Sequence, residues 1–338
     1  MELFDKDLDR DVVVVAEIGV NHEGDVDAAS RLVRLAAEAG ADAVKFQTYT
    51  PARFTASGDR ERLARVTKFA LDQAAHRRLA REAADRGVHF FSTPLTEDVV
   101  PFLDELCPAF KIASGDLTFE PVIRAATRTG KPVILSTGAG TVDEIERAVG
   151  WVREDIGVDR LADRLVLMHC VSAYPTPVEQ ANVRAVPYLA ERFGVHVGYS
   201  NHVIGAEACL AAISLGACVI EVHFTDRKEG RTFRDHALSF EPADLKELVR
   251  QAALIRAALG AFGKPVQPEE KANRDAIRKG VVASRDLSAG AVLTDADLMY
   301  ARPASEFSAS ERPALIGRRL RDAVGRGEVI ARANVVEA

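Results

Sequence analysis

The chain has 338 residues, of which 47% are hydrophobic and 28% charged, a composition typical of a packed globular protein and too apolar for a disordered one. Its formal net charge of −6 argues against general nucleic-acid binding, which needs a basic surface. No apolar run approaches the ~20 residues of a membrane span, no secretory h-region follows the N-terminus, and four cysteines without a C-x-x-C pair suit reduced thiols, so we expect a cytoplasmic protein.

Short β-branched runs alternate with longer amphipathic stretches along the first 260 residues. The expected strand and helix pairs are 12–16 with 26–39, 43–47 with 72–86, 89–93 with 97–106, 110–113 with 121–129, 133–136 with 142–156, 165–170 with 183–193, 195–199 with 204–215, and 219–224 with 242–259. Five of these helices are followed by a glycine just before the next strand, as expected of a helix C-terminus. Because eight such units imply parallel pairing through right-handed crossovers, the pattern predicts a (β/α)₈ TIM barrel.

An open, doubly wound sheet is the alternative fold for the same alternation. It would be expected to carry a glycine-rich phosphate loop after the first strand. The segment from Gly19 to Gly24 has neither the Lys-Ser/Thr of a P-loop nor the spacing of a dinucleotide fingerprint. The sequence therefore favours the closed barrel.

The periodic pattern stops shortly after residue 260. Glycines, prolines and charged residues then mark a linker, and about 60 residues of short elements follow it. A core of this size is only marginally stable by itself, so we expect this segment to pack against the barrel or against another subunit. The predicted division is a catalytic barrel over 1–262, a linker over 263–277 and a small domain over 278–338.

The carboxyl end of every predicted strand carries polar or ionisable side chains. In chain order these include Glu17; Lys45 and Gln47; Ser92 and Thr93; Lys111, Ser114 and Asp116; Ser136; His169 with Ser172 and Tyr174; Ser200, Asn201 and His202; and Glu221 with His223. Because the active sites of TIM barrels lie at this end of the strands, the pattern predicts an active site there.

His202 and His223 follow neighbouring strands near this rim. Neutral imidazole is a common ligand of divalent metals, and Glu17 or Glu221 could add an oxygen. The sequence therefore predicts a metal site, with a pair of satisfied core histidines as the alternative.

Lys45 and Lys111 end strands that face the same pocket. With the hydroxyls of Ser114, Ser136 and Ser200 they could hold a phosphate and a carboxylate together. Because buried lysines are costly unless paired, the alternative is a Lys–Glu ion pair inside the barrel.

A series of ordered motifs resembles the sialic acid (N-acetylneuraminate) synthase family over nearly the whole chain. The motifs are Ala16-Glu17-Ile18-Gly19-Val20-Asn21-His22-Glu23-Gly24, Val44-Lys45-Phe46-Gln47-Thr48, Lys111-Ile112-Ala113-Ser114-Gly115-Asp116, Leu135-Ser136-Thr137-Gly138, His169-Cys170, Ala173-Tyr174-Pro175-Thr176-Pro177, Gly198-Tyr199-Ser200-Asn201-His202 and Glu221-Val222-His223-Phe224-Thr225. Residues from about 278 onward, with Arg302-Pro303, resemble the family's antifreeze-protein-like (SAF) domain.

The resemblance implies an enzyme that condenses phosphoenolpyruvate with the open-chain aldehyde of an N-acylated hexosamine and releases phosphate. It implies a divalent metal, usually Mn²⁺ with Mg²⁺ or Co²⁺ possible, and a domain-swapped homodimer. The implied site residues are His202 and His223 for the metal; Glu17, Lys45 and Lys111 for catalysis; Thr93, Ser114, Ser136, Tyr174 and Ser200 for phosphoenolpyruvate; and Gln47, Asp235 and the partner's Arg302 for the sugar.

The chain departs from the family pattern near the sugar. Asn201 stands where bacterial members tend to have Asp, Val222 where Arg is frequent, and Ser172 where some have Asn, while the loop 49–69 is short. The acceptor therefore stays open among N-acetylmannosamine, a diacetamido-trideoxyhexose of the legionaminic or pseudaminic type, and others. The alternative functions are a metal-dependent pyruvate aldolase and a non-catalytic sugar-binding protein.

Overall fold

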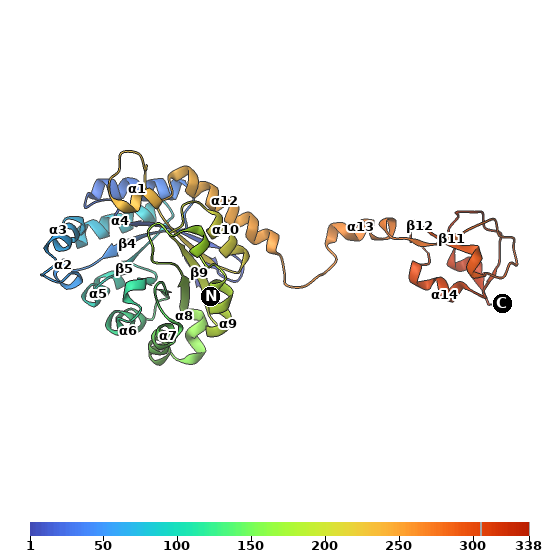
Figure 1. The fold of residues 1–338 in the computed structure, drawn as a ribbon, viewed down its shortest axis with the longest axis horizontal. Coiled ribbons are helices and arrows are strands. Elements are labelled where there is room, and N and C mark those ends of the chain that lie inside the picture. Colours follow the sequence, from blue (N-terminus) through green and yellow to red (C-terminus); the bar gives the residue numbers. More distant parts are fainter. Residues whose placement is uncertain (305, 338) are drawn as a thin grey trace. The chain divides into compact units, whose positions relative to one another are not determined.

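Eight parallel strands close into a barrel in the computed structural model, which describes residues 1–304 and 306–337 (Figure 1). The last barrel strand pairs with the first, so that His223 lies beside Glu17 in register. The barrel strands are β3 (Val13–Gly19), β4 (Ala43–Thr48), β5 (His89–Pro94), β6 (Phe110–Ile112), β7 (Val133–Ser136), β8 (Leu165–His169), β9 (His196–Asn201) and β10 (Val219–His223). The predicted (β/α)₈ barrel is confirmed, and the open sheet is not the fold.

One or more helices follow each barrel strand, and most of them cover the outside of the barrel (Figure 1). They are α1 (Val26–Glu38), α2 (Pro51–Phe54), α3 (Arg60–Phe69), α4 (Gln73–Asp85), α5 (Val100–Asp104), α6 (Glu120–Arg128), α7 (Val142–Ile156), α8 (Leu161–Arg164), α9 (Ala185–Phe193), α10 (Glu207–Ser214), α11 (Arg234–Leu238) and α12 (Pro242–Leu259). The five glycines expected after helices (Gly40, Gly87, Gly130, Gly194 and Gly216) all have positive φ, as a helix C-terminus requires.

The barrel core is apolar on both faces of its strands. Val13, Val14 and Val15 are almost completely buried, because inward side chains pack in the barrel and outward ones pack under the helices. A short hairpin of β1 (Glu2–Leu3) and β2 (Lys6–Asp7) precedes the barrel, and its Phe4 ring lies 4.9 Å from that of Phe91.

The chain divides into two compact units, Met1–Gly260 and Ala261–Ala338. The second begins with α13 (Pro268–Ile277), a helix without a buried residue, in the segment expected to be a linker. Its antiparallel pairs are β11 (Gly280–Ala283) with β12 (Leu298–Ala301) and β13 (Arg319–Leu320) with β14 (Val335–Val336), and α14 (Arg312–Leu315) lies between them in sequence. The unit has its own core, which includes Val281, Leu298, Leu315 and Ile330.

In the part of the chain that the structure describes, no helix combines the length and apolar character needed to cross a bilayer.

Candidate active site

A cavity of about 630 Å³ opens at the carboxyl ends of the barrel strands. This volume lies within the usual range for small-molecule sites. Twelve of the thirteen predicted site residues line it: Glu17, Lys45, Gln47, Thr93, Lys111, Ser114, Ser136, Tyr174, Ser200, His202, His223 and Asp235. The barrel thus gathers side chains from all parts of its 260 residues around one space.

Arg302 is the thirteenth predicted residue and belongs to the second unit. There its Nε donates a hydrogen bond to the carbonyl oxygen of Ile277 at 2.6 Å. A role for Arg302 at the cavity therefore stays a prediction.

Two lysines and two carboxylates form a buried cluster at the floor of the cavity. Lys45 Nζ lies 2.7 Å from Glu17 Oε2 and 3.7 Å from Glu221 Oε1, and Lys111 Nζ lies 3.3 Å from the same Glu221 oxygen. Thr93 Oγ1 accepts a further bond from Lys45 at 3.1 Å. Both lysines thus form the Lys–Glu ion pairs expected as the alternative to an anion site. Their binding of a substrate anion stays a prediction.

The cluster shifts the pKa values of its members in opposite directions. Burial alone would raise the pKa of Glu221, but Lys111 and Lys45 outweigh it and lower that pKa to about 2. Burial and the charge of Glu221 raise the pKa of Glu17 against the opposing effect of Lys45. Glu17 is therefore the carboxyl group of the cluster whose pKa moves toward the range in which a group exchanges protons at neutral pH.

A bulge in β3 aims Glu17 into the cavity. The pairing of β3 with β4 shifts register between Glu17 and Gly19, and Gly19 has φ +53°. A Cβ at Gly19 would lie 2.9 Å from Glu17 Oε1, the oxygen that also accepts a hydrogen bond from Gln47 at 3.1 Å. Bulges of this kind re-aim side chains next to active sites.

The rings of His202 and His223 lie 5.5 Å apart, centroid to centroid. Because a carbonyl oxygen only accepts, His202 Nδ1 carries the hydrogen that it donates to Val171 O at 2.6 Å, which leaves its Nε2 lone pair free. Burial, with the neighbouring His223, lowers the pKa of His202 to about 4, and burial also lowers the pKa of His223. Both imidazoles are therefore neutral at pH 7, the form that binds metals.

These two histidines fit a divalent ion held in an open site. The described residues contain no cluster of three or more His, Cys, Asp or Glu arranged for a metal. If the two imidazoles hold an ion, its remaining coordination positions would be open to substrate and water.

The serine side of the cavity offers unused hydrogen-bonding capacity. Ser136 Oγ is buried and has no hydrogen-bond partner among the described residues. Ser114 Oγ accepts a hydrogen bond from the backbone N–H of Gly138 at 3.1 Å, and a Cβ at Gly138 would lie 2.8 Å from that oxygen. The close approach of this loop therefore requires glycine at position 138.

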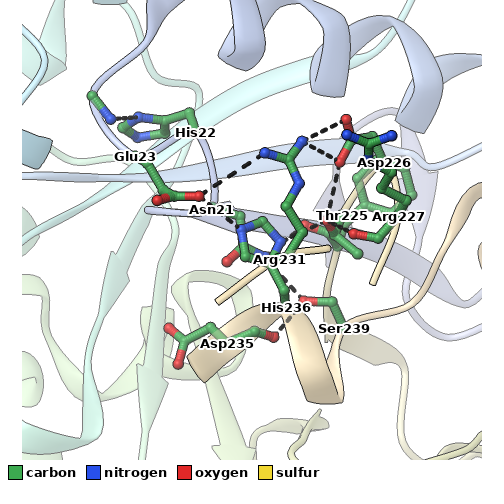
Figure 2. A network of polar contacts seen from close by, with 12 residues as sticks. Asn21, His22, Glu23, Thr225, Asp226, Arg227, Arg231, Asp235, His236 and Ser239 are labelled. Carbon is green, nitrogen blue, oxygen red and sulfur yellow. Dashed lines mark hydrogen bonds and ion pairs between the residues drawn. The ribbon is translucent and has the colours of Figure 1, made fainter. Parts of the chain in front are cut away.

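A polar network fixes α11, the helix that carries Asp235 (Figure 2). His236 Nδ1 lies 2.7 Å from Thr225 Oγ1, and Asn21 Nδ2 donates to Ser239 Oγ at 3.0 Å. The carboxylate of Asp235 points away from His236 and Thr225, and Asp235 lines the cavity. Thr225 and Asn21, in the loops that follow β10 and β3, thus fix the position of α11 on the side away from the Asp235 carboxylate.

Comparison with known proteins agrees with the motifs in the sequence. Residues 32–264 match the NeuB family, and residues 278–336 match the SAF domain. The chain belongs to the NeuB family. An N,N'-diacetyllegionaminic acid synthase of Campylobacter jejuni is 36% identical over 91% of this chain and 96% of its own length.

Two further NeuB relatives span most of the chain. A pseudaminic acid synthase of Campylobacter jejuni is 30% identical over 94% of this chain and 95% of its own. The crystal structure of N-acetylneuraminic acid synthetase from Leptospira borgpetersenii, in complex with citrate, is 32% identical, with a TM-score of 0.73 over 78% of this chain and 90% of that one. The resemblance to sialic acid synthases is thus confirmed.

The remaining histidines near the rim of this NeuB barrel do not line the cavity. His169 Nε2 bonds to the carbonyl oxygen of Ala181 at 2.9 Å, and His22 Nδ1 accepts from the backbone N–H of Gly24 at 3.0 Å. Through these backbone bonds they hold the loops that follow β8 and β3.

The sequence prediction missed the part of the cavity formed by α2 and α3. These residues are Phe54, Arg62, Arg65, Val66 and Phe69, whereas the sequence pattern predicts a loop over 49–69. Asp59, whose side chain caps α3, and the helical spacing of 62, 65, 66 and 69 could have revealed it.

Proposed function

We propose that this protein condenses phosphoenolpyruvate with the open-chain aldehyde of an N-acylated hexosamine to form a nine-carbon 2-keto acid. Carbon 3 of phosphoenolpyruvate forms a bond to the aldehyde carbon, and the aldehyde oxygen gains a proton. Water then adds to carbon 2 and loses a proton, and the bond from carbon 2 to the phosphate oxygen breaks as phosphate leaves. The observation that carries the proposal is the meeting of two buried lysines, Glu17 and two neutral histidines in one cavity.

Lys45 and Lys111 neutralise the phosphate and carboxylate of phosphoenolpyruvate in this proposal. Their present partners, Glu17 and Glu221, keep them charged inside the barrel until the substrate arrives. Ser136, whose hydroxyl has no partner in the described residues, and Ser114 donate hydrogen bonds to the same anion. Buried donors fixed before binding stabilise developing charge better than water does.

Glu17 acts as the general base and general acid for the reaction at carbon 2. Its raised pKa and its contact with Lys45 allow it to take a proton from the added water and to return one to the departing phosphate. Gln47, bonded to Glu17, and Asp235 contact hydroxyls of the sugar.

His202 and His223 would hold a divalent ion, Mn²⁺ with Mg²⁺ or Co²⁺ as alternatives, whose Lewis acidity polarises the aldehyde carbonyl. Neutral imidazoles with a hydrogen bond at the opposite ring nitrogen, as His202 has to Val171, are suited to this.

The test is phosphate release from phosphoenolpyruvate with Mn²⁺ and a panel of N-acyl hexosamines. We expect EDTA to abolish activity and His202→Ala to lower it at least 100-fold, while His196→Ala, at a histidine that bonds to Asp9 and does not line the cavity, stays within about 3-fold. If no acceptor releases phosphate, or if EDTA and His202→Ala change nothing, the proposal fails. Turnover of pyruvate without phosphate release would favour the aldolase instead.

The active form in this proposal is a domain-swapped homodimer in which Arg302 reaches the partner's sugar site. Light scattering should then give about twice the chain mass of 36.6 kDa. A solution containing only the ~37 kDa species would contradict it.

A further inference from the structure

Arg234 lines the cavity but lies outside the sequence motifs that mark the rest of the site. It is the first residue of α11, directly before Asp235, and its side chain faces the same space as Glu17 and the two histidines. Although this side chain is 63% exposed, it contacts two other cavity residues, a carboxylate and an aromatic ring. Fixing so flexible a side chain costs conformational entropy, so the two contacts decide what Arg234 does.

The first contact is an ion pair with the carboxylate of Asp235. Arg234 Nε donates a hydrogen bond to Asp235 Oδ1 at 2.8 Å, and Arg234 Nη2 lies 2.8 Å from the same oxygen. The Asp235 side chain is only 9% exposed, and within the described residues Arg234 is the one cation at ion-pair distance from it. The guanidinium therefore compensates a buried charge and occupies Oδ1, which leaves Oδ2 available to a ligand.

The second contact is with the ring of Tyr174. The guanidinium carbon of Arg234 lies 4.7 Å from the centre of that ring, at the distance of a cation–π interaction. The Tyr174 ring also lies 4.1 Å from the ring of His202 and meets the ring of His223 edge to face at 6.1 Å. Arg234 therefore holds Tyr174 beside the two histidines.

These contacts join side chains from two separate parts of the barrel. Tyr174 lies in the loop after β8, whereas Asp235 lies on α11, after β10. One guanidinium contacts both, so the ring that packs on the histidines and the carboxylate that faces the cavity are held in a fixed relation. Lysine could not do this, because it has neither a planar face for the ring nor a fork of donors for the carboxylate.

We infer that Arg234 is a positioning residue for the acceptor sugar, because it fixes the Asp235 carboxylate relative to Tyr174 and the histidine pair. The inference rests on the proposed function and adds to it a residue that acts through its neighbours rather than on the reacting atoms. An acceptor hydroxyl bound at Asp235 Oδ2 is then held at a set distance from the aldehyde at the histidines. Small displacements of a bound reactant lower the rate, so this relation matters for turnover as well as for binding.

The alternative is a surface ion pair with no effect on the reaction. Arg234 and Asp235 are neighbours in the sequence, and exposed ion pairs contribute little to stability. This alternative accounts for the contact with Asp235 but not for the contact with Tyr174, which is distant in sequence. It predicts that loss of the guanidinium changes neither Michaelis constant.

The test measures kcat and both KM values for Arg234→Ala with Mn²⁺, phosphoenolpyruvate and the N-acyl hexosamine that releases phosphate fastest. We expect KM for the acceptor to rise about 10-fold or more and kcat to fall several-fold, because the acceptor is no longer held at both ends. KM for phosphoenolpyruvate should stay within about 2-fold, since the lysines and serines are unchanged. Arg234→Lys should recover only part of the loss, because it restores the charge beside Asp235 without the planar face.

Added guanidinium gives a readout that a merely structural role would not move. The Arg234 side chain is 63% exposed, so a free guanidinium ion can reach the space that Arg234→Ala leaves. We expect millimolar guanidinium chloride to lower KM for the acceptor in this variant toward the wild-type value. Sodium chloride at the same concentration should not do so.

Arg77 is the matched control, because it makes the same pair of contacts away from the cavity. Its guanidinium carbon lies 5.1 Å from the centre of the Phe102 ring, and its Nη2 lies 2.7 Å from Glu105 Oε2. Arg77 does not line the cavity. Arg77→Ala should leave kcat and both KM values within about 2-fold of wild type, with no response to guanidinium.

The outcomes separate the inference from the function on which it rests. Phosphate release with an unchanged KM for the acceptor in Arg234→Ala overturns the inference and leaves the proposed function standing. Equal rises in both KM values, or a loss that guanidinium does not reverse, overturn it in favour of a general structural role. If Arg234→Ala does not fold, Arg234→Gln removes the charge at a similar shape and repeats the comparison. A wild-type protein that releases phosphate with no acceptor defeats the function and the inference together.

Discussion

Replacing Glu221 with Gln removes the charge that two buried lysines share. Glu221 Oε1 lies 3.3 Å from Lys111 Nζ and 3.7 Å from Lys45 Nζ, and it accepts a hydrogen bond from Ser200 at 3.1 Å. Gln keeps the shape and can still accept hydrogen bonds. The variant therefore leaves Lys111 buried without its carboxylate partner, and burial already lowers the pKa of this lysine.

Two routes give the size of this effect to the same order of magnitude. At 3.3 Å and an effective dielectric constant of about 20, the attraction between Lys111 and Glu221 is about 5 kcal/mol before the cost of burial. The lowering of the Glu221 pKa from 4.5 to about 2 already includes that cost and corresponds to about 3 kcal/mol. We expect Glu221→Gln to lower the free energy of unfolding by about 3 kcal/mol at pH 7, as for other broken buried pairs.

The pH dependence has a definite sign. Because the folded-state pKa is lowered, the contribution of Glu221 is fully present above the unfolded value of 4.5 and is lost as pH falls toward about 2. The difference between wild type and Glu221→Gln should thus be constant from pH 7 to about 5.5 and shrink below that.

Urea unfolding followed by tryptophan fluorescence measures this difference. The single tryptophan, Trp151, lies on α7 and packs against the barrel core, so the signal reports the barrel alone. Glu38→Gln, at an exposed carboxylate paired with Arg34, is the control and should change stability by less than about 0.5 kcal/mol. A loss below about 1 kcal/mol for Glu221→Gln, or a difference that does not shrink in acid, would refute this account of the cluster.

Two further substitutions test the serine pocket and the network behind Asp235. Gly138→Ala would bring a Cβ within 2.8 Å of Ser114 Oγ, so we expect KM for phosphoenolpyruvate to rise about 10-fold or more. An unchanged KM for phosphoenolpyruvate in Gly138→Ala would contradict the proposed binding of this substrate by the serines. Gly150→Ala, in α7 where a Cβ meets nothing, is the control and should stabilise the barrel by about 0.5–1 kcal/mol. His236→Asn should raise KM for the acceptor through Asp235 and leave KM for phosphoenolpyruvate within about 2-fold, and equal changes in both would indicate a general loss of structure.

The repeating part of the fold could be predicted from the sequence, because each unit has the same periodicity. The predicted helix over 142–156 coincides with α7, and the strand over 133–136 coincides with β7. The helix expected over 97–106 is shorter, since Pro101 interrupts backbone bonding and α5 begins only at Val100. The strand expected over 12–16 is longer, because the bulge at Gly19 prolongs β3.

The site residues that lie on barrel strands could be predicted from the sequence. Those that lie on loops and short helices between the strands could not. Lys45, Lys111 and His223 lie at strand positions that parallel pairing brings to one end of the barrel. The short helices α2, α3 and α11 depend on contacts such as that of Phe69 with Phe233, which are distant in sequence. Helix α13 carries no apolar face, so only Pro268 and its capping residues mark it.

The charge-balanced floor of the cavity has a consequence for how this barrel can evolve. Barrels of this kind usually fill such inward positions with branched apolar residues, and replacing a buried ion network by well-packed apolar side chains is often neutral or stabilising. Lys45, Lys111, Glu17 and Glu221 therefore hold positions at which selection for stability alone would favour Leu or Met. The cluster marks a trade-off between stability and activity, and the most stable descendants of this chain should be those that have lost their catalysis.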